Sequence, residues 1–426
     1  MNLPLNVSWR ALTRGTATSI FVICLFVISP AFLRAQKNSC VECHLQLEDS
    51  LKAPAESFAA DVHKQYGLGC HDCHGGNPAQ DDIELAKDKS FQDAPKRAEI
   101  PEFCGSCHSD SAYMRKFNPN IRVDQLSLYR TSQHGLLLKK GDANAAVCTD
   151  CHGVHGIQSS SFPKSQTFPW NIPQTCGRCH ANADFMKGYG IPVRQVDDYK
   201  QSVHARALFE KKDLSAPVCN DCHGNHGAAP PEVTSIAFVC RQCHPSAGEL
   251  FSKSPHKQAF DGLGIAECEV CHGNHLISPP SDNLLAGGKA DVCVQCHDAG
   301  TEPHQTGLKI KQQIDNFVAS SEAAGALLAT AERKGVEVSE ARFKLQDATT
   351  ALVLARNLTH ALSPAEIEVS LEEGAKSLAD AKTRGEEALR EANFRRSGLI
   401  IATLFIMLLA AALYLKIRQI QAQPDR

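Results

Sequence analysis

The sequence predicts a mainly α-helical protein with extensive loops, in which a cysteine-rich region precedes a bundle of long helices and a C-terminal transmembrane helix. Nine C-x-x-C-H pentapeptides fall between residues 40 and 297, and the segments between them are rich in Gly, Pro, Asn and Asp, which favours short helices and loops. Residues 305–396 contain no cysteine and carry apolar residues at helical spacing. Residues 398–415 are apolar and uncharged, a run long enough to cross a bilayer.

Each pentapeptide is the attachment signature of a c-type haem, in which two cysteines form thioethers and the adjacent histidine ligates the iron. Eighteen of the 19 cysteines lie in these motifs, and with only 19 histidines in 426 residues the nine adjacent histidines are not a product of composition. Zinc ribbons or a disulfide scaffold are the alternatives, but zinc sites do not require a histidine directly after the second cysteine. We therefore expect nine covalently bound haems, which would form the core of a chain with only 6% aromatic residues.

The motifs define the attachment residues and the proximal iron ligands. The expected thioether cysteines are Cys40, Cys43, Cys70, Cys73, Cys104, Cys107, Cys148, Cys151, Cys176, Cys179, Cys219, Cys222, Cys240, Cys243, Cys268, Cys271, Cys293 and Cys296. The expected proximal ligands are His44, His74, His108, His152, His180, His223, His244, His272 and His297.

The haem-bearing region, residues 37–304, repeats after the leading motif at Cys40. Each of four units has an upstream lone histidine, a first motif, and a second motif some tens of residues later. In three units the first motif continues as H-G-x-H, whereas the first unit has Gly75 and Gly76 there instead. The recurring histidines are expected distal ligands: upstream, His63, His134, His204 and His256; in H-G-x-H, His155, His226 and His275. His71 and His304 are further candidate ligands.

The number of histidines indicates how the irons are ligated. Ten histidines lie outside the proximal positions, and Met114 and Met186 are the only methionines of the haem-bearing region. Bis-histidine coordination is therefore the economical interpretation for most or all haems, and it predicts low potentials. The tenth histidine, His360, lies on an expected helix far from the motifs. Whether it ligates an iron or is an ordinary helix histidine stays open; ligation would require the helical segment to fold back onto the haems.

The two ends of the chain carry export and membrane signals. Residues 1–36 have arginines, an apolar run and then Ala35, which is typical of a secretory signal cleaved after that alanine. An uncleaved N-terminal anchor is the alternative. We expect residues 397–416 to span the cytoplasmic membrane, with residues 417–426 as a basic cytoplasmic tail and the haem-bearing region in the periplasm. The net charge of -3 argues against a nucleic-acid partner.

Residues 305–396 are expected to form a hairpin-like bundle of helices. Breaks are expected near Lys334-Gly335 and Leu362-Ser363, and Ser363-Pro364-Ala365-Glu366 has the pattern of a helix start. A spacer or a dimerising stalk is one interpretation of this bundle, so an oligomer formed through it is left open. A lid that ligates or shields a haem is the other.

The paired motifs, the H-G-x-H sequences, the upstream histidines and the helical C-terminal segment resemble the multihaem cytochrome c superfamily over residues 40–396. The resemblance is to doubled C-x-x-C-H and cytochrome c3-like electron carriers, related to pentahaem and octahaem cytochromes, here with nine haems and a membrane anchor. It implies haem attachment outside the cytoplasmic membrane. Some reductases of this superfamily replace one proximal histidine by lysine, and no C-x-x-C-K occurs here.

Two classes of function follow. The first is an electron carrier that links a quinol-oxidising membrane subunit to a periplasmic or outer-envelope acceptor. The second is a reductase or oxidase of a small nitrogen or sulfur compound (nitrite, hydroxylamine or tetrathionate) at one five-coordinate haem. Ten spare histidines for nine irons favour the carrier, and no catalytic residue is assigned. If an open haem exists, the irregular first part of the repeat predicts it at Cys40 or Cys70.

Overall fold

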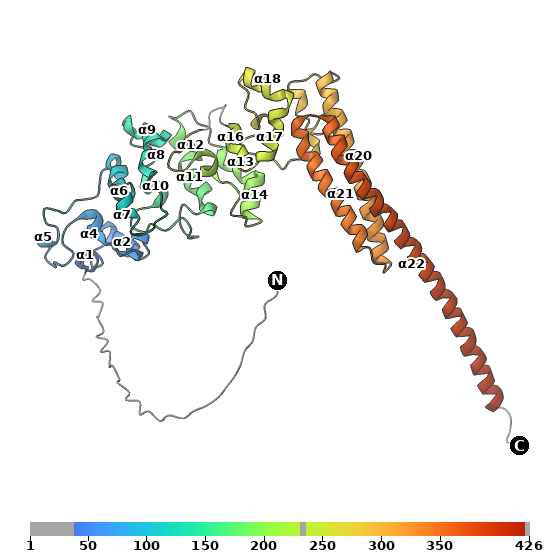
Figure 1. The fold of residues 1–426 in the computed structure, drawn as a ribbon. Coiled ribbons are helices and arrows are strands. Elements are labelled where there is room, and N and C mark those ends of the chain that lie inside the picture. Colours follow the sequence, from blue (N-terminus) through green and yellow to red (C-terminus); the bar gives the residue numbers. More distant parts are fainter. Residues whose placement is uncertain (1–37, 231–235, 422–426) are drawn as a thin grey trace, which may run out of the picture.

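The computed structural model describes residues 38–230 and 236–421, which contain all 19 histidines and the eighteen motif cysteines. The expected N-terminal signal or anchor lies outside the described residues, as does the end of the C-terminal tail. The described ranges are helical and contain no strand, as predicted. Figure 1 shows a row of short helices and loops that leads into a bundle of long helices, from which one helix continues alone.

Short helices carry the nine motifs and the upstream histidines. The motifs lie on or at α1 (Ser39–His44), α4 (Cys70–His74), α6 (Ile100–His108), α10 (Cys148–His152), α11 (Ile172–His180), α15 (Cys219–His223), α16 (Ile236–Arg241), α19 (Glu269–His272) and η5 (Cys293–Gln295). The upstream histidines lie on α3 (Val62–Gln65), α9 (Gln133–Lys139), α14 (Val203–Phe209) and α18 (Pro255–Leu263). The connecting helices are α2 (Asp49–Phe58), α5 (Ile83–Ala86), η1 (Arg97–Glu99), α7 (Ser111–Met114), α8 (Gln125–Thr131), η2 (Pro169–Asn171), α12 (Ala183–Met186), α13 (Gln195–Gln201), α17 (Pro245–Lys253) and η4 (Asp282–Leu284).

Local hydrogen bonds form these short motif helices, although helices of this length are marginal on their own. In the C-x-D-C-H motifs the aspartate accepts a hydrogen bond from the backbone N–H just before the first cysteine; for Asp150 and Val147 the distance is 2.7 Å. Each of these helices ends at the glycine after the motif histidine, and Gly153 adopts φ +80°. This turn reverses the chain, so the H-G-x-H histidine leaves its own motif and approaches a neighbouring unit.

Three long helices form the C-terminal bundle: α20 (Glu302–Arg333), α21 (Ser339–Leu358) and α22 (Pro364–Gln421). The first break falls at Gly335, with φ +78°, and the second at the turn η6 (Thr359–Ala361) just before Ser363. The Ser363 hydroxyl accepts a 3.4 Å hydrogen bond from the Glu366 N–H at the start of α22. The predicted apolar positions pack into two buried clusters between the helices.

The bundle packs against the haem-bearing region through α17, which contacts both η6 and α21. The Asn357 side-chain amide donates a 2.6 Å hydrogen bond to the Ser246 hydroxyl. The Arg356 guanidinium donates two hydrogen bonds, of 3.0 and 2.6 Å, to the Asp282 carboxylate. These contacts hold η6 and its His360 beside the last motifs.

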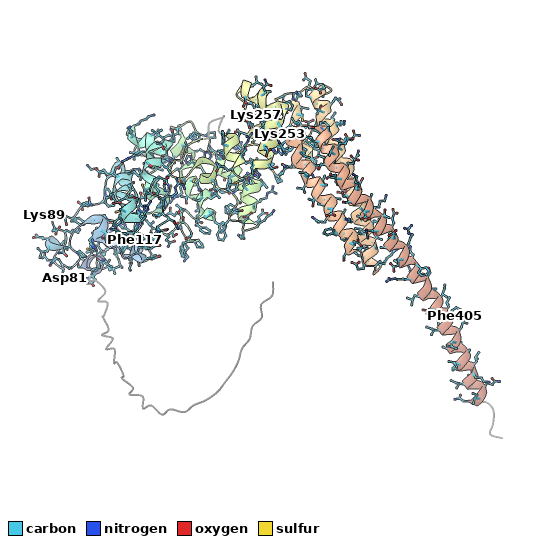
Figure 2. The ribbon with its side chains drawn as sticks, in the orientation of Figure 1. Asp81, Lys89, Phe117, Lys253, Lys257 and Phe405 are labelled. Carbon is cyan, nitrogen blue, oxygen red and sulfur yellow. The ribbon has the colours of Figure 1, made fainter. Side chains whose placement is uncertain are left out.

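Helix α22 passes without a break from the bundle into the apolar run, across the boundary expected at residue 397. Its most apolar stretch has a mean hydropathy of 2.5 and is not buried by any part of the described chain. Phe405, on the portion that projects beyond the bundle in Figure 2, is 69% exposed. By length and composition α22 is a candidate membrane span, and a bilayer would cover the side chains that the protein leaves open.

Candidate haem sites

Sixteen of the 19 histidines form eight facing pairs, and each pair joins one motif histidine to one histidine outside the motifs. The ring centroids in a pair lie 5.8 to 6.3 Å apart. The pairs are His108 with His63, His74 with His155, His180 with His134, His152 with His226, His244 with His204, His223 with His275, His297 with His256 and His272 with His360.

This spacing suits a metal held between two imidazoles. A metal–imidazole bond is about 2 Å long, so two such bonds on opposite sides of one iron place the ring centroids roughly 6 Å apart. Rings in direct contact would not need to repeat this distance eight times. Together with two cysteines beside one member of each pair, the donor set fits a covalently attached haem with two axial histidines.

Several rings are oriented by a hydrogen bond at Nδ1, which leaves Nε2 free for a metal. Nδ1 of His74 lies 3.1 Å from the Gln92 carbonyl oxygen, and Nδ1 of His360 lies 2.8 Å from the Asn357 carbonyl oxygen. His63 differs, because its Nδ1 lies 2.9 Å from Oδ1 of Asp61, a carboxylate that is only 2% exposed. A carboxylate partner makes an imidazole a stronger donor to a metal than a carbonyl partner does.

Burial keeps most of these rings uncharged. It is the largest cause of the lowered pKa of ten paired histidines, and it lowers the pKa of His152 to about 4, with the nearby His226 as the second cause. Above its pKa an imidazole is neutral and carries the lone pair that a metal requires. These ten rings are therefore in the ligating form at neutral pH.

The pairing follows one rule. An upstream histidine faces the second motif of its own unit, and an H-G-x-H histidine faces the first motif of the preceding unit. Backbone hydrogen bonds join neighbouring units in the same register. In each, the acceptor is the carbonyl five residues after the first-motif histidine of one unit, and the donor is the N–H of the residue just before the upstream histidine of the preceding unit. These bonds join Ile157 to Val62, Ala228 to Gln133 and Ile277 to Val203, at 2.7 to 2.9 Å.

His360 fills the one position that this rule leaves vacant at the C-terminal end. No fifth unit follows, so no H-G-x-H histidine can reach the first motif of the fourth unit. His360 faces His272 there, with a centroid distance of 6.1 Å. Sequence reasoning left this histidine unassigned, and the signal that could have identified it was the offset of the repeat.

Three histidines face no other histidine: His44, His71 and His304. His304 is buried at the start of α20, where its Nε2 lies 3.2 Å from the Asp291 carboxylate. His71 packs near Gly69, and its Nε2 lies 3.7 Å from Asp72. Both were expected to be distal ligands, and neither is brought opposite a motif histidine.

The cysteines place the motifs in a row that follows the chain. Burial, and next a thiol of an adjacent motif, raise the pKa of Cys70, Cys73, Cys151, Cys222 and Cys271, whose neighbours are Cys40, Cys107, Cys176, Cys240 and Cys296. A hydrogen bond from the neighbouring motif is the first cause of the raised pKa of Cys104, Cys176 and Cys268, whose partners are Cys148, Cys219 and Cys240. Thioether formation would remove these titrations, but the proximity remains. Each motif therefore has a thiol close to a thiol of the next motif in the chain, from the first motif to the ninth.

The geometry also addresses the zinc and disulfide alternatives. In the described residues no three His, Cys, Asp or Glu side chains cluster closely enough to hold a metal ion together. No disulfide joins any of the eighteen motif cysteines, all of which lie in the described residues. Two thiols beside one of two facing imidazoles form a haem donor set, whereas a zinc ribbon would gather four ligands.

Two family models match this chain. Residues 62–181 match the cytochrome c3 family, and residues 262–302 match the doubled CXXCH motif. The first match spans the upstream histidine of the first unit to the second motif of the second unit. No curated protein and no solved structure matches the chain.

Proposed function

We propose that this chain, whose cytochrome c3-like region and doubled C-x-x-C-H motif support a place in the multihaem cytochrome c family, is a membrane-anchored nine-haem electron carrier. It would take electrons from a quinol-oxidising membrane partner and pass them to a periplasmic or outer-envelope acceptor. The observation that carries this proposal is the set of eight facing histidine pairs.

In this function each of the eight facing pairs would hold one haem iron. When bound, each haem supplies a centre that accepts and releases one electron. The chain fixes the two imidazoles, attaches the porphyrin through two cysteines and surrounds it with short helices. Two histidine ligands in place of a methionine keep the potentials low. The Asp61 carboxylate would lower the potential of the Cys104 haem further, because it increases the donor strength of His63.

The order of the motifs gives electron transfer along the row of haems a direction. The eighth and ninth motifs lie next to the bundle, since His360 faces the eighth and α20 contacts η5 at the ninth. The first motif lies at the opposite end of the row (Figure 1). Electrons delivered on the bundle side of the row would therefore enter at the haems of Cys268 and Cys293, which lie at the end of α20 away from the membrane span, and leave toward the haem of Cys40.

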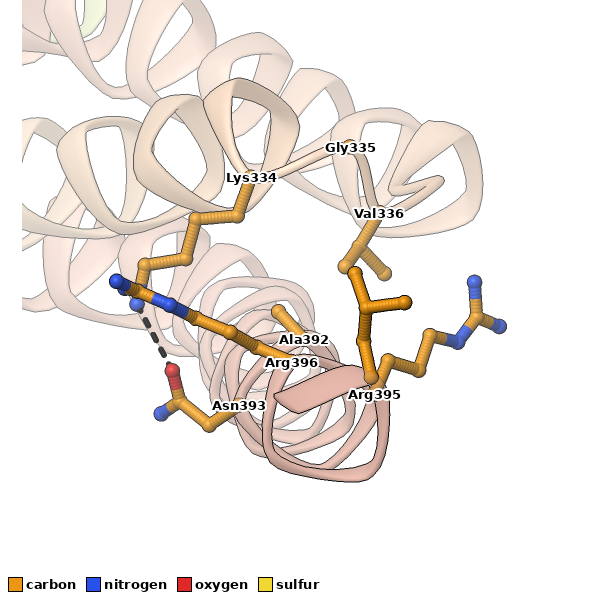
Figure 3. Close-up of a pocket in the computed structure, with 8 residues that line it drawn as sticks. Lys334, Gly335, Val336, Ala392, Asn393, Arg395 and Arg396 are labelled. Carbon is orange, nitrogen blue, oxygen red and sulfur yellow. Dashed lines mark hydrogen bonds between the residues drawn. The ribbon is translucent and has the colours of Figure 1, made fainter. Parts of the chain in front are cut away.

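The membrane end of the bundle carries a basic pocket of about 380 Å³ where α22 leaves its neighbours (Figure 3). Lys334 and Arg396 both line it, and Lys334 donates a 3.2 Å hydrogen bond to the Asn393 side-chain oxygen. Within the described chain neither cation has a carboxylate partner, whereas Arg395 pairs with Glu391. Because Leu399 of the apolar run also lines the pocket, these cations would lie at the level of lipid phosphates and support the anchored arrangement.

The test of the carrier is a count of haems and electrons on the detergent-purified protein. Intact mass under denaturing conditions should give nine covalent haems for each chain. A reductive titration should take up nine electrons for each chain at low potential. A mass with fewer than nine haems, in a sample whose motif cysteines are all intact, would contradict the proposal.

The pairing makes a specific prediction at His226, which faces His152 at 6.0 Å. His226→Ala should leave nine haems attached and convert the haem of Cys148 to a five-coordinate, high-spin form. Low-temperature electron paramagnetic resonance with spin quantitation measures this as a gain of one high-spin iron per chain. His304→Ala is the matched control, because His304 faces no motif histidine and its loss should change no spin state. Unchanged low-spin signals in the His226 variant would remove it from the ligands.

A second prediction concerns the buried Asp61. Asp61→Asn replaces the carboxylate beside His63 Nδ1 with a neutral amide and so weakens the donor strength of that imidazole. The potential of one haem should rise by tens of millivolts while the other eight hold, which a spectroelectrochemical titration resolves. Asp61 also accepts hydrogen bonds from the His63 backbone N–H on Oδ1 and from the Ile157 backbone N–H on Oδ2, and asparagine, with one carbonyl oxygen, can keep only one of the two, so the haem content of the variant is measured together with its potentials. A titration curve identical to that of the wild type would show that this carboxylate does not tune the haem.

The alternative function, reduction of a small nitrogen or sulfur compound, requires one iron with an open position. One observation favours such a position: His44 is the single motif histidine that no second histidine faces.

A further inference from the structure

We propose that the haem of Cys40 and Cys43 has His44 as its only axial protein ligand, and that its open side binds small neutral ligands in preference to anions. This inference rests on the proposed nine-haem function and adds a ligand-binding site at the end of the row of haems that lies away from the bundle. It is carried by the register of the repeat, by the contacts of His44 and by the charge around it.

The register of the repeat assigns the missing ligand to one residue. In three units the histidine three residues after a first-motif histidine faces the first motif of the unit before. Applied once more, the rule directs the residue three positions after His74 toward the leading motif. That residue is Asn77. Its side-chain oxygen accepts a 3.1 Å hydrogen bond from the Ala79 N–H and so closes a local turn.

The chain after His74 returns to the leading motif even though the histidine is absent. Gly75 has φ +70°, close to the +80° of Gly153 and the +78° of Gly224 at the same position. The segment returns to the leading motif, because the Pro78 carbonyl accepts a 3.0 Å hydrogen bond from the Ser39 N–H. The chain therefore still returns to the leading motif, but its path is altered: Gly76 has φ +77°, and the docking carbonyl lies four residues after the motif histidine where the other units use the fifth.

The proximal side of the same site is complete. His44 follows Cys40 and Cys43 on α1, and its Nδ1 lies 2.7 Å from the Leu51 carbonyl oxygen. This is the arrangement of His74, whose Nδ1 contacts the Gln92 carbonyl. Nε2 of His44 is thus available to iron in the same way as in the paired sites.

Of the two spare histidines, His304 is engaged elsewhere, whereas the Nδ1 atom of His71 has no hydrogen-bond partner among the described residues. His304 lies on α20 at the bundle end of the row, against Asp291. His71 is closer to the leading motif, on α4, but its Nε2 lies 3.7 Å from Asp72, whose carboxylate also accepts a 2.6 Å hydrogen bond from the Gly69 N–H. His71 is the one protein ligand that could compete for this iron, so the experiment must include it.

Charge determines the class of ligand. Residues 38–93 contain eleven Asp and Glu against four Lys, a net charge of -7 within a chain of net -3. Asp81 and Lys89 mark this end of the molecule in Figure 2. A negative field of this kind lowers the local concentration of anions, and added salt screens it. Nitrite, azide or tetrathionate would meet this barrier, whereas carbon monoxide, nitric oxide, imidazole or neutral hydroxylamine would not.

The test uses the full-length haem-loaded protein and three probes: carbon monoxide, imidazole and azide. Carbon monoxide added to the dithionite-reduced protein should bind one haem in nine, measured by the difference spectrum against total haem. Imidazole should bind the oxidised protein at low salt, and azide should bind several-fold more weakly there and recover as salt rises. Asn77→His should reduce carbon monoxide binding from one site to none, and Cys40→Ser with Cys43→Ser should abolish it together with one haem. His304→Ala should retain the single site.

The outcomes separate this inference from the carrier function. A wild-type protein that has nine haems and binds no carbon monoxide, and that gains one site in His71→Ala, would make His71 the ligand and overturn the inference while leaving the carrier intact. Binding that survives loss of the Cys40 haem would place the open iron elsewhere and also overturn it. Azide binding that is as strong as imidazole binding at low salt would overturn the ligand class. A chain with fewer than nine haems would instead contradict the carrier itself.

Discussion

His360→Ala is expected to convert the haem of Cys268 from low-spin to high-spin and to loosen the bundle from the haem-bearing region. His360 faces His272 at 6.1 Å from a turn between α21 and α22, so one imidazole would join the two parts of the molecule through an iron. Spin quantitation should register one new high-spin iron per chain. Hydrogen exchange should increase in η6 and α17, because the hydrogen bonds that remain there, from Arg356 and Asn357, are exposed to solvent.

A matched variant separates ligation from docking. Asn357→Ala removes the 2.6 Å hydrogen bond to Ser246 on the same interface but leaves the His360 ring in place. The variant should lower the free energy with which the bundle docks on the haem-bearing region by about 1 kcal/mol, and it should change no spin state. If His360→Ala adds no high-spin haem to the wild-type count, the bundle is only a stalk, and His360 is an ordinary helix histidine.

Ending the chain after residue 396 is expected to release it from the membrane. The apolar run holds ten Leu, Ile and Phe residues, and each contributes roughly 0.3 to 0.6 kcal/mol to insertion at the centre of a bilayer, about 3 to 6 kcal/mol in all. The bundle core ends at Ala392, before the cut, so the haem-bearing region and its nine haems should be retained. Fractionation after a carbonate wash, with haem staining, measures the shift from membrane to soluble periplasm.

The full-length chain carrying Leu408→Ala is the control, since one lost leucine leaves the span apolar. It should stay in the membrane fraction. A truncated chain that also stays there would show that residues 398–415 are not the only anchor and would favour the uncleaved form of the N-terminal segment.

The sequence predicted the elements better than it predicted their partners. The helical class, the bundle core and the breaks near Gly335 and Ser363 followed from periodicity, glycine and capping residues, all of which act over a few positions. It also identified which histidines recur. It could not match them to motifs, because each pair joins residues 40 or more positions apart and depends on how one unit docks on the next.

His304 and His360 illustrate this limit. His304 follows the ninth motif closely in sequence, yet the start of α20 directs its ring toward Asp291. His360 lies 88 positions after His272, and two long helices bring it back. Closeness along the chain misled in the first case, and the packing of the bundle decided the second.

Low-temperature electron paramagnetic resonance of the oxidised, detergent-purified protein, with spins quantified against total haem, tests the ligand scheme most directly. The eight facing pairs and the single unpaired His44 predict eight low-spin haems and one high-spin haem in each chain. Two or more high-spin haems per chain would contradict the assignment of the pairs as axial ligands.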